Sequence, residues 1–358
     1  SYLRVMIRTG QLLAGIAESV GYRVVSIDLL FLLVNELRAL GEGDYTFIKM
    51  LEYIVLVLPE RLYFVFPMAS LVGALLGLGL LAGHSELVVM RSSGVSLLQI
   101  SWAVLRAALL LIITVTLLGE LVVPRSMQYA EMLREKAVSG SQTVITPQGT
   151  WIRDGADFVR IKEILITGEL IGVIRYQFNQ QHELLSSTYA TRAEYNTDQN
   201  LWVMHDVKQT NINGQETQVS TFSTLNWQSG IQPQLLNILI EEPENLSIVG
   251  LVNYIHYLQD NHLRVQEYNL ALWKKLWQPF ATIVMVFIAI PVIFGPLRSA
   301  TMGLRLLTGV LLGFGFYILN QLFGPLSLVY ASFPAPLAAS LPSLVFALGG
   351  IILFRRIR

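Results

Sequence analysis

Uncharged hydrophobic blocks of membrane length recur along the chain. Residues 62–83 and 276–297 each run for 22 positions without Asp, Glu, Lys or Arg. A helix needs about 20 apolar residues to cross a bilayer, so each block predicts one membrane-spanning helix. Residues 306–354 are uncharged over 49 positions, which exceeds a single span. Because Gly324-Pro325 interrupts this block, it predicts two spans.

Two further segments are long enough to cross a bilayer but carry charges. Residues 102–123 are apolar except for Arg106 and Glu120, and the region 12–40 has an apolar centre between several charged residues. The chain therefore predicts six spans, near 12–40, 62–83, 102–123, 276–297, 306–323 and 337–354.

The stretch between the third and fourth spans has a different pattern. Short runs of alternating hydrophobic and polar residues are separated by turn signals, and Asp154-Gly155 and Asn213-Gly214 are hairpin pairs. This pattern predicts five to nine short antiparallel strands in a sandwich or jelly roll. Residues 246–263 then have helical spacing, with Ser247 placed to cap the N-terminus.

The expected fold is a polytopic α-helical membrane protein with six transmembrane helices and a β-jelly-roll-like domain inserted between spans three and four. The predicted domains are 1–124, with spans one to three and a short helix near 84–96; 125–245, the β domain; and 246–358, with a connecting helix and spans four to six.

Composition agrees with a membrane protein and narrows its function. Hydrophobic residues make up 53% of the chain and charged residues 14%, whereas soluble domains carry about 25% charged residues. The 25 Lys and Arg balance the 25 Asp and Glu, which argues against a basic nucleic-acid binder and against an acidic disordered chain. The absence of cysteine excludes disulfides, thiol catalysis and Cys-ligated zinc.

Arginine positions predict the orientation. With a cytoplasmic N-terminus, the inside segments carry Arg4, Arg8, Arg91, Arg298, Arg305, Arg355, Arg356 and Arg358. This distribution follows the excess of Lys and Arg on the cytoplasmic side of membrane proteins. Both termini are then expected in the cytoplasm, and the β domain outside it.

The chain has no catalytic motif. It lacks a GxxxxGK[ST] loop for nucleotide phosphates, an HExxH zinc site and a GxSxG nucleophile elbow. We therefore expect no catalytic residue, no metal and no cofactor.

The loop 84–96 is too apolar for a free connection. Ser85 and Gly94 are placed to begin and end a short helix, with Glu86 in its first turn. Aliphatic side chains beside a charge favour a helix that docks in a groove of a cytoplasmic partner. The alternative is an interfacial helix that lies on the lipid. The residues assigned to this docking contact are Glu86, Leu87, Val89, Met90 and Arg91.

Glycines at GxxxG spacing occur in two spans. Such spacing lets helices approach closely in lipid and predicts a helix–helix interface there. The pairs are Gly73 and Gly77, Gly79 and Gly83, and Gly309 and Gly313.

Several basic residues lie near the predicted outer ends of the spans, where the excess of Lys and Arg on the cytoplasmic side does not account for them. Snorkelling to lipid headgroups accounts for each of them singly. As a set around aromatic walls they fit a large amphiphile with anionic headgroups, because the planar fork of arginine binds two phosphate oxygens at once. The candidate lipid-binding residues are Arg38, Arg61, Arg134, Lys136, Lys274, Lys275, Tyr63, Phe66 and Phe316.

Four segments resemble the LptF/LptG family of lipopolysaccharide export permeases: 66–96, 242–258, 273–279 and 293–330. They contain HSELVVMRSSGVS, WKKLWQP and FGPLRS, and cover most of the chain outside the first 25 residues and the β domain. By position, Glu86 matches the family's coupling-helix glutamate, and Arg38 and Arg134 match basic positions. The chain departs from its relatives at Ala39 and Glu60, where some have basic residues.

The resemblance implies a permease subunit of an ABC transporter that extracts lipopolysaccharide from the inner membrane of a Gram-negative bacterium. It implies a paired permease, LptF, a dimer of the ATPase LptB, and LptC, a single-span periplasmic protein. The β domain would lie in the periplasm and lead to a periplasmic bridge. Two alternatives stay open: an integral membrane enzyme that modifies a lipid, and a non-transporting subunit that transmits ATPase motion.

Overall fold

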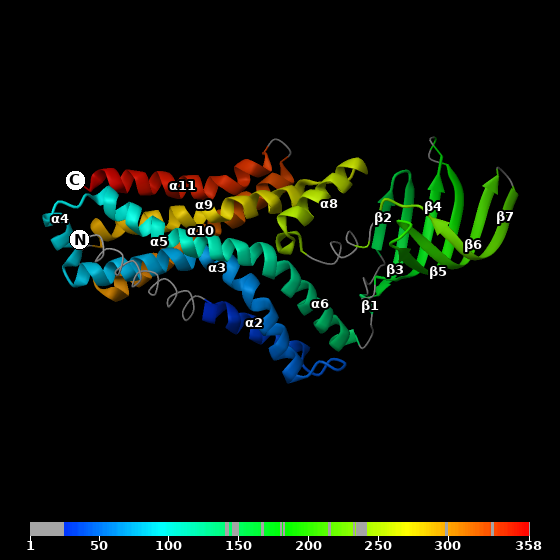
Figure 1. Cartoon of the computed structure of the whole chain (residues 1–358), viewed down its shortest axis with the longest axis horizontal. Coiled ribbons are helices and arrows are strands. Elements are labelled where there is room, and N and C mark those ends of the chain that lie inside the picture. The colour runs from blue at the N-terminus through cyan, green and yellow to red at the C-terminus, as the bar shows by residue number, and fades with distance from the viewer. Residues whose placement is uncertain are drawn as a thin grey trace.

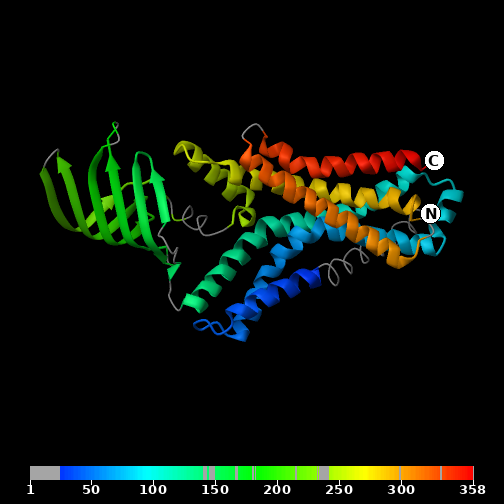
Figure 2. The same cartoon turned by 180° about the vertical axis from the view of Figure 1, so that it is seen from behind.

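The structure, a computed structural model, describes residues 25–139, 143–144, 150–165, 168–179, 181, 183–213, 216–231, 233, 242–297, 300–330 and 333–357. The molecule is elongated, with a bundle of helices and a β sheet beyond one end of it (Figures 1 and 2). The short helix α4 (Glu86–Ser92) and the end of α11 (Ala335–Arg356) lie at the opposite end.

Within the described residues, five helical runs are long and apolar enough to cross a membrane. They are α3 (Phe47–Gly83), the continuous run Leu97–Val138, α9 (Gln266–Phe294), α10 (Met302–Val329) and α11. The run Leu97–Val138 comprises α5 (Leu97–Leu117), a π-helical turn η2 (Leu118–Val122) and α6 (Val123–Ser139). Each coincides with one of the last five predicted spans, which are confirmed as helices.

The first predicted span, 12–40, is described only from residue 25 onward. Its described part is α2 (Val25–Ala39), a helix of 15 residues, which is shorter than a bilayer requires. The rest of that predicted span lies outside the described residues. Two shorter elements, η3 (Pro243–Asn245) and α8 (Ile248–Asp260), connect the sheet with α9.

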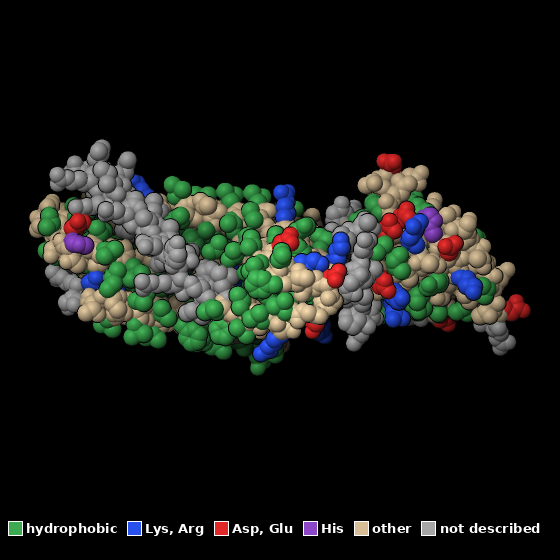
Figure 3. Space-filling model, turned by 90° about the horizontal axis from the view of Figure 1, so that it is seen from below, with side chains coloured by type: hydrophobic (Ala, Val, Ile, Leu, Met, Phe, Trp, Pro, Cys, Tyr) green, Lys and Arg blue, Asp and Glu red, His purple; other side chains and the backbone are tan. Residues whose placement is uncertain are grey.

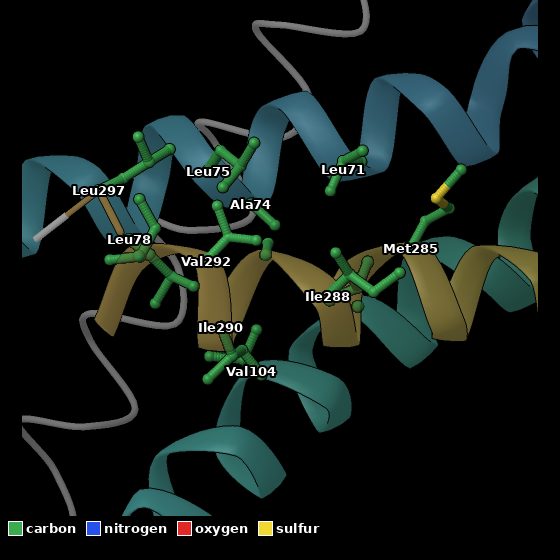
Figure 4. Close-up of a cluster of buried hydrophobic side chains, with 14 of the residues drawn as sticks. Leu71, Ala74, Leu75, Leu78, Val104, Met285, Ile288, Ile290, Val292 and Leu297 are labelled. Atoms are coloured by element: carbon green, nitrogen blue, oxygen red, sulfur yellow. The ribbon is translucent and has the colours of Figure 1, made fainter. Parts of the chain in front are cut away.

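The core of the bundle lies between α3 and α9. Leucines of α3 face aliphatic side chains of α9, and α5 adds a third wall (Figure 4). The central members are Leu71, Leu75 and Leu78 from α3, Met285, Ile288 and Val292 from α9, and Val104 from α5. In lipid there is no water to exclude, so these side chains stabilise the bundle through close packing between the helices.

The glycines of α10 permit its close approach to α3. A Cβ atom at Gly309 would lie 2.9 Å from Leu75 Cδ1, and one at Gly313 would lie 3.3 Å from Met68 Cβ. Helix α10 therefore needs small residues at this crossing, where α3 presents larger side chains. The predicted helix–helix role of this GxxxG pair is confirmed.

The β domain is a single antiparallel sheet of seven described strands. They are β1 (Thr143–Val144), β2 (Thr150–Asp154), β3 (Asp157–Leu165), β4 (Leu170–Phe178), β5 (Leu184–Asn196), β6 (Leu201–Asn213) and β7 (Glu216–Trp227). The order is β1-β3-β4-β5-β6-β7, and β2 also pairs with β3. The predicted hairpins are present, with Asp154 opposite Asp157 and Asn213 opposite Glu216.

The described strands do not show the connections of the predicted jelly roll. From β3 to β7 each described strand pairs with the next one along the chain, whereas a jelly roll needs Greek-key crossovers between two sheets. Alternation and turn signals predict strands and hairpins but contain no information on how hairpins are joined. One face is buried over Val173, Ala190, Trp202 and Met204, and β7 is largely exposed.

The surface divides in the same way as the fold. Figure 3 shows hydrophobic side chains over much of the helical part, and charged side chains concentrated toward the sheet. Exposed aliphatic and aromatic side chains on α10 include Leu307, Leu311, Phe314 and Tyr317. A soluble monomer rarely exposes such a continuous apolar surface, so this face is suited to lipid or to a second membrane protein.

Candidate functional site

A cavity of about 510 Å³ lies between α3, α9, α10 and α11. Its residues on α9 and α11 come from the first halves of these helices, toward α8 and the sheet (Figure 1). Aromatic side chains line it beside polar ones, including Phe64, Trp277, Phe316, Tyr317 and Gln278. This combination of apolar wall and polar groups is typical of ligand pockets and suits an amphiphile.

The charges that line the cavity balance. Three are cations, Arg61, Lys274 and Lys275, and three are carboxylates, Glu60, Glu242 and Glu244. Lys274 Nζ lies 2.6 Å from Glu244 Oε1, and Arg61 Nε lies 3.3 Å from Glu60 Oε2. An anionic headgroup would therefore meet cations that already have carboxylate partners.

Lys275 is a positioning residue. Its side chain is 6% exposed, Nζ donates a hydrogen bond to the carbonyl of Leu246 at 2.5 Å, and Nζ lies 3.6 Å from Glu120 Oε2. Its ammonium also lies 5.9 Å from the centre of the Tyr63 ring. These contacts hold the ammonium inside the protein at the wall of the cavity.

Glu120 is the residue at this site that the sequence patterns did not single out. It lies in the π-helical turn η2, and its two carboxylate oxygens accept the backbone N–H of Ile248 at 2.8 and 3.0 Å. This contact ties the run Leu97–Val138 to the start of α8, where the helix dipole favours an anion. A carboxylate inside an apolar segment is costly, and that was the available signal.

The three predicted aromatic residues are all buried, and Phe316 belongs both to the helical core and to the cavity wall. Phe316 lines the cavity and packs against Phe346, with ring centres 5.4 Å apart. Tyr63 also lines the cavity but is buried, and a Cβ atom at Gly119 would lie 2.3 Å from its ring. Phe66 belongs to the helical core.

Two further aromatic residues of the predicted walls, Phe64 and Tyr317, have the exposure that a lipid contact needs. Phe64 is 38% exposed and Tyr317 is 47% exposed, and both line the cavity.

The basic residues at the far end of α2 and α6 form a separate group. Arg134 Nε lies 3.1 Å from Glu36 Oε2, and the Tyr45 hydroxyl donates to the same oxygen at 2.9 Å. Burial, together with this hydrogen bond, raises the pKa of Tyr45 well above its ordinary value, so its hydroxyl stays protonated and can donate. Arg38 and Lys136 are exposed. None of the three basic residues lines the 510 Å³ cavity.

Helix α4 places the residues assigned to ATPase coupling on two faces. Leu87 is 4% exposed and belongs to the core between α3, α5 and α9. Val88 and Val89 are 49% and 61% exposed and point away from that core. Met90 is partly buried and Arg91 is exposed, so the exposed face centres on the two valines.

The ends of α4 differ from the prediction in one respect. Ser85 adopts a left-handed conformation with φ of 61°, and its side chain makes no capping hydrogen bond. Gly94, with φ of 83°, ends the helix as predicted, and the N–H of Val95 donates to the carbonyl of Met90 at 3.1 Å. Glu86 is half-buried in the first turn.

Comparison with known proteins places these features in one family. The family described as "Lipopolysaccharide export system permease LptF/LptG" matches residues 22–356. The lipopolysaccharide export system permease protein LptG of Escherichia coli (strain K12) is 37% identical over 337 residues, which is 94% of this chain and 93% of that protein. The protein of the same name from Haemophilus influenzae is 35% identical over 323 residues, 90% of each chain. The chain therefore belongs to the LptF/LptG family of lipopolysaccharide export system permeases.

Proposed function

We propose that the chain is a permease subunit of an ABC transporter that extracts lipopolysaccharide from the inner membrane and drives it toward the outer membrane through a periplasmic bridge. The observation that carries this proposal is the 510 Å³ cavity, which combines aromatic walls with ion-paired charges inside a bundle of apolar helices. In this cavity the apolar chains of a lipid can contact the aromatic walls, and its phosphorylated headgroup can contact the cations. Family membership supports lipopolysaccharide as that lipid.

Energy enters through α4 in this proposal. ATP is bound and hydrolysed by a separate partner, the LptB dimer, and the exposed valines of α4 dock in a groove of that partner. Arg91, Arg355 and Arg356 lie on elements that meet at the same end of the molecule (Figure 1). Their clustering supports a cytoplasmic location for this end and a periplasmic location for the sheet.

The remaining partners meet other surfaces. LptF pairs with the exposed apolar face of the bundle to enclose the lipid, and LptC associates beside it. β7 is an edge strand of 12 residues whose side chains are largely exposed. Because an edge strand carries unpaired backbone groups, β7 is suited to continue the sheet into a periplasmic partner.

Photocrosslinking tests where the lipid binds. A photoreactive phenylalanine analogue at Phe64 or Tyr317, in the full complex in cells, is expected to give a lipopolysaccharide adduct because both side chains line the cavity and are partly exposed. The matched control is Trp102, an aromatic residue on α5 that is 58% exposed and does not line the cavity. Adducts of equal yield at all three positions would mean contact with bulk membrane lipid and would contradict the proposal.

A further inference from the structure

Two adjacent lysines of α9 hold the same short segment. Lys274 Nζ contacts Glu244 Oε1 at 2.6 Å, and Lys275 Nζ contacts the carbonyl oxygen of Leu246 at 2.5 Å. Glu244 and Leu246 belong to the η3 turn and the residue after it, immediately before α8. The position of this segment, 242–247, therefore depends on both lysines.

The segment positions α8, and α8 contacts the sheet. At its start, the N–H of Ile248 donates to Glu120. Near its end, the Tyr257 hydroxyl donates to the carbonyl of Arg153 at 2.7 Å, and Asn261 Oδ1 accepts the N–H of Gly155 at 2.9 Å. Arg153 and Gly155 belong to the β2–β3 hairpin, so a continuous set of contacts joins the two lysines to the sheet.

The two lysines differ in their access to the cavity. The Lys274 side chain is 29% exposed and that of Glu244 is 41% exposed, whereas Lys275 is 6% exposed. Partly exposed ion pairs are weak, so a competing anion can replace one partner. A buried ammonium that is bound to a carbonyl and near a carboxylate does not exchange in this way.

We propose that Lys274 is an exchangeable contact: a phosphate group entering the cavity displaces Glu244 from Lys274, which loosens segment 242–247 and so reports an occupied cavity to α8 and the sheet. The inference rests on the proposed function and names a step of it. A phosphate carries up to two charges against one for a carboxylate, which favours the exchange. The nearby carboxylates of Glu242 and Glu244 make displacement, rather than simple addition, the route by which an anion reaches Lys274.

Hydrogen exchange measures the loosening directly. The N–H of Asn245 donates to the Glu242 carbonyl at 3.0 Å, and that of Leu246 donates to the Pro243 carbonyl at 3.4 Å. In the intact complex in nanodiscs, bisphosphorylated lipid A is expected to speed exchange across segment 242–247 by about threefold, the effect of losing one weak ion pair. The same lipid with its phosphates removed is expected to leave exchange unchanged.

Two substitutions separate competition from a simple structural ion pair. Glu244→Gln removes the competitor, so exchange is fast without lipid and lipid A binds about threefold more tightly. Lys274→Gln also makes exchange fast, but it removes the extra affinity for phosphorylated over dephosphorylated lipid. Glu267→Gln removes the same charge from an exposed position on α9 and is expected to change neither quantity.

The possible outcomes separate a failure of the exchangeable contact from a failure of the proposed function. If lipid A binds with a phosphate preference and exchange of segment 242–247 does not change, the exchangeable contact is wrong and the proposed function stands. Equal acceleration by the dephosphorylated lipid, or equal affinity of the Glu244→Gln and Lys274→Gln variants, also overturns the inference. If neither lipid binds the complex, the proposed function fails together with it.

Discussion

Replacing Glu120 by alanine is expected to lower the free energy of unfolding of the helical part by about 3 kcal/mol or more. The substitution removes the acceptor of the Ile248 N–H and takes the carboxylate away from the buried ammonium of Lys275, which keeps its hydrogen bond to the Leu246 carbonyl. Removing one member of a buried ion pair costs more than the pair contributes, because the other charge stays in a poorly solvated position. The expected result is a lower melting temperature in detergent and faster proteolysis near α8.

A second substitution shows whether the uncompensated charge is the cause. Adding Lys275→Met to Glu120→Ala removes the buried ammonium and is expected to restore part of the lost stability. Glu52→Ala, at an exposed position of α3, serves as the charge-matched control and is expected to change little. If Glu120→Ala changes the melting temperature no more than Glu52→Ala does, the contact between Glu120 and α8 does not stabilise the protein.

Replacing Val89 by aspartate is expected to abolish productive contact with the ATPase and leave the permease in the membrane. Val89 is 61% exposed on α4, so the folded chain tolerates a charge there. An apolar groove in a partner does not, and losing one buried valine alone lowers affinity by about tenfold or more. Pull-down of LptB with the variant complex, and ATP hydrolysis by it, measure the effect.

Leu87 and Val249 give this prediction its two controls. Leu87→Asp places a charge in the core and is expected to reduce the amount of folded chain, because Leu87 is 4% exposed. Val249→Asp makes the same substitution as at Val89 at a 66% exposed position of α8, and is expected to retain LptB. Retention of LptB by Val89→Asp would return α4 to the interfacial-helix alternative.

The membrane spans could be predicted because absence of charge over about 20 residues has few other causes in a folded chain. The true extent of α3 could not, because Lys49, Glu52, Glu60 and Arg61 fall in its first half and look like loop residues. Within the helix, Glu60 is 6% exposed and pairs with Arg61, a contact that spacing alone does not reveal. Hairpins were predictable from local turn chemistry, whereas the pairing of β1 with β3 joins strands that no single turn connects.

The sequence allowed us to predict which types of residue line the candidate site. It did not allow us to predict the role of each side chain. Lys274 and Lys275 are neighbours in sequence and both line the cavity, yet the Lys274 side chain is 29% exposed and that of Lys275 only 6%, because adjacent residues of a helix point in different directions. The same reason separates Leu87 from Val88 on α4. Arg134 looked like a free cation, and its partner Glu36 is 98 residues away in the chain.

Transfer of lipopolysaccharide by the reconstituted complex tests the central claim most directly. Proteoliposomes that contain the chain with LptF, LptB and LptC are supplied with lipopolysaccharide, ATP and a soluble periplasmic acceptor. We predict unaltered lipopolysaccharide on the acceptor only when ATP is present, with little transfer for Val89→Asp and normal transfer for Val249→Asp. Chemically altered lipid would support the enzyme alternative. ATP hydrolysis without transfer would support a non-transporting subunit, and either result would contradict the account.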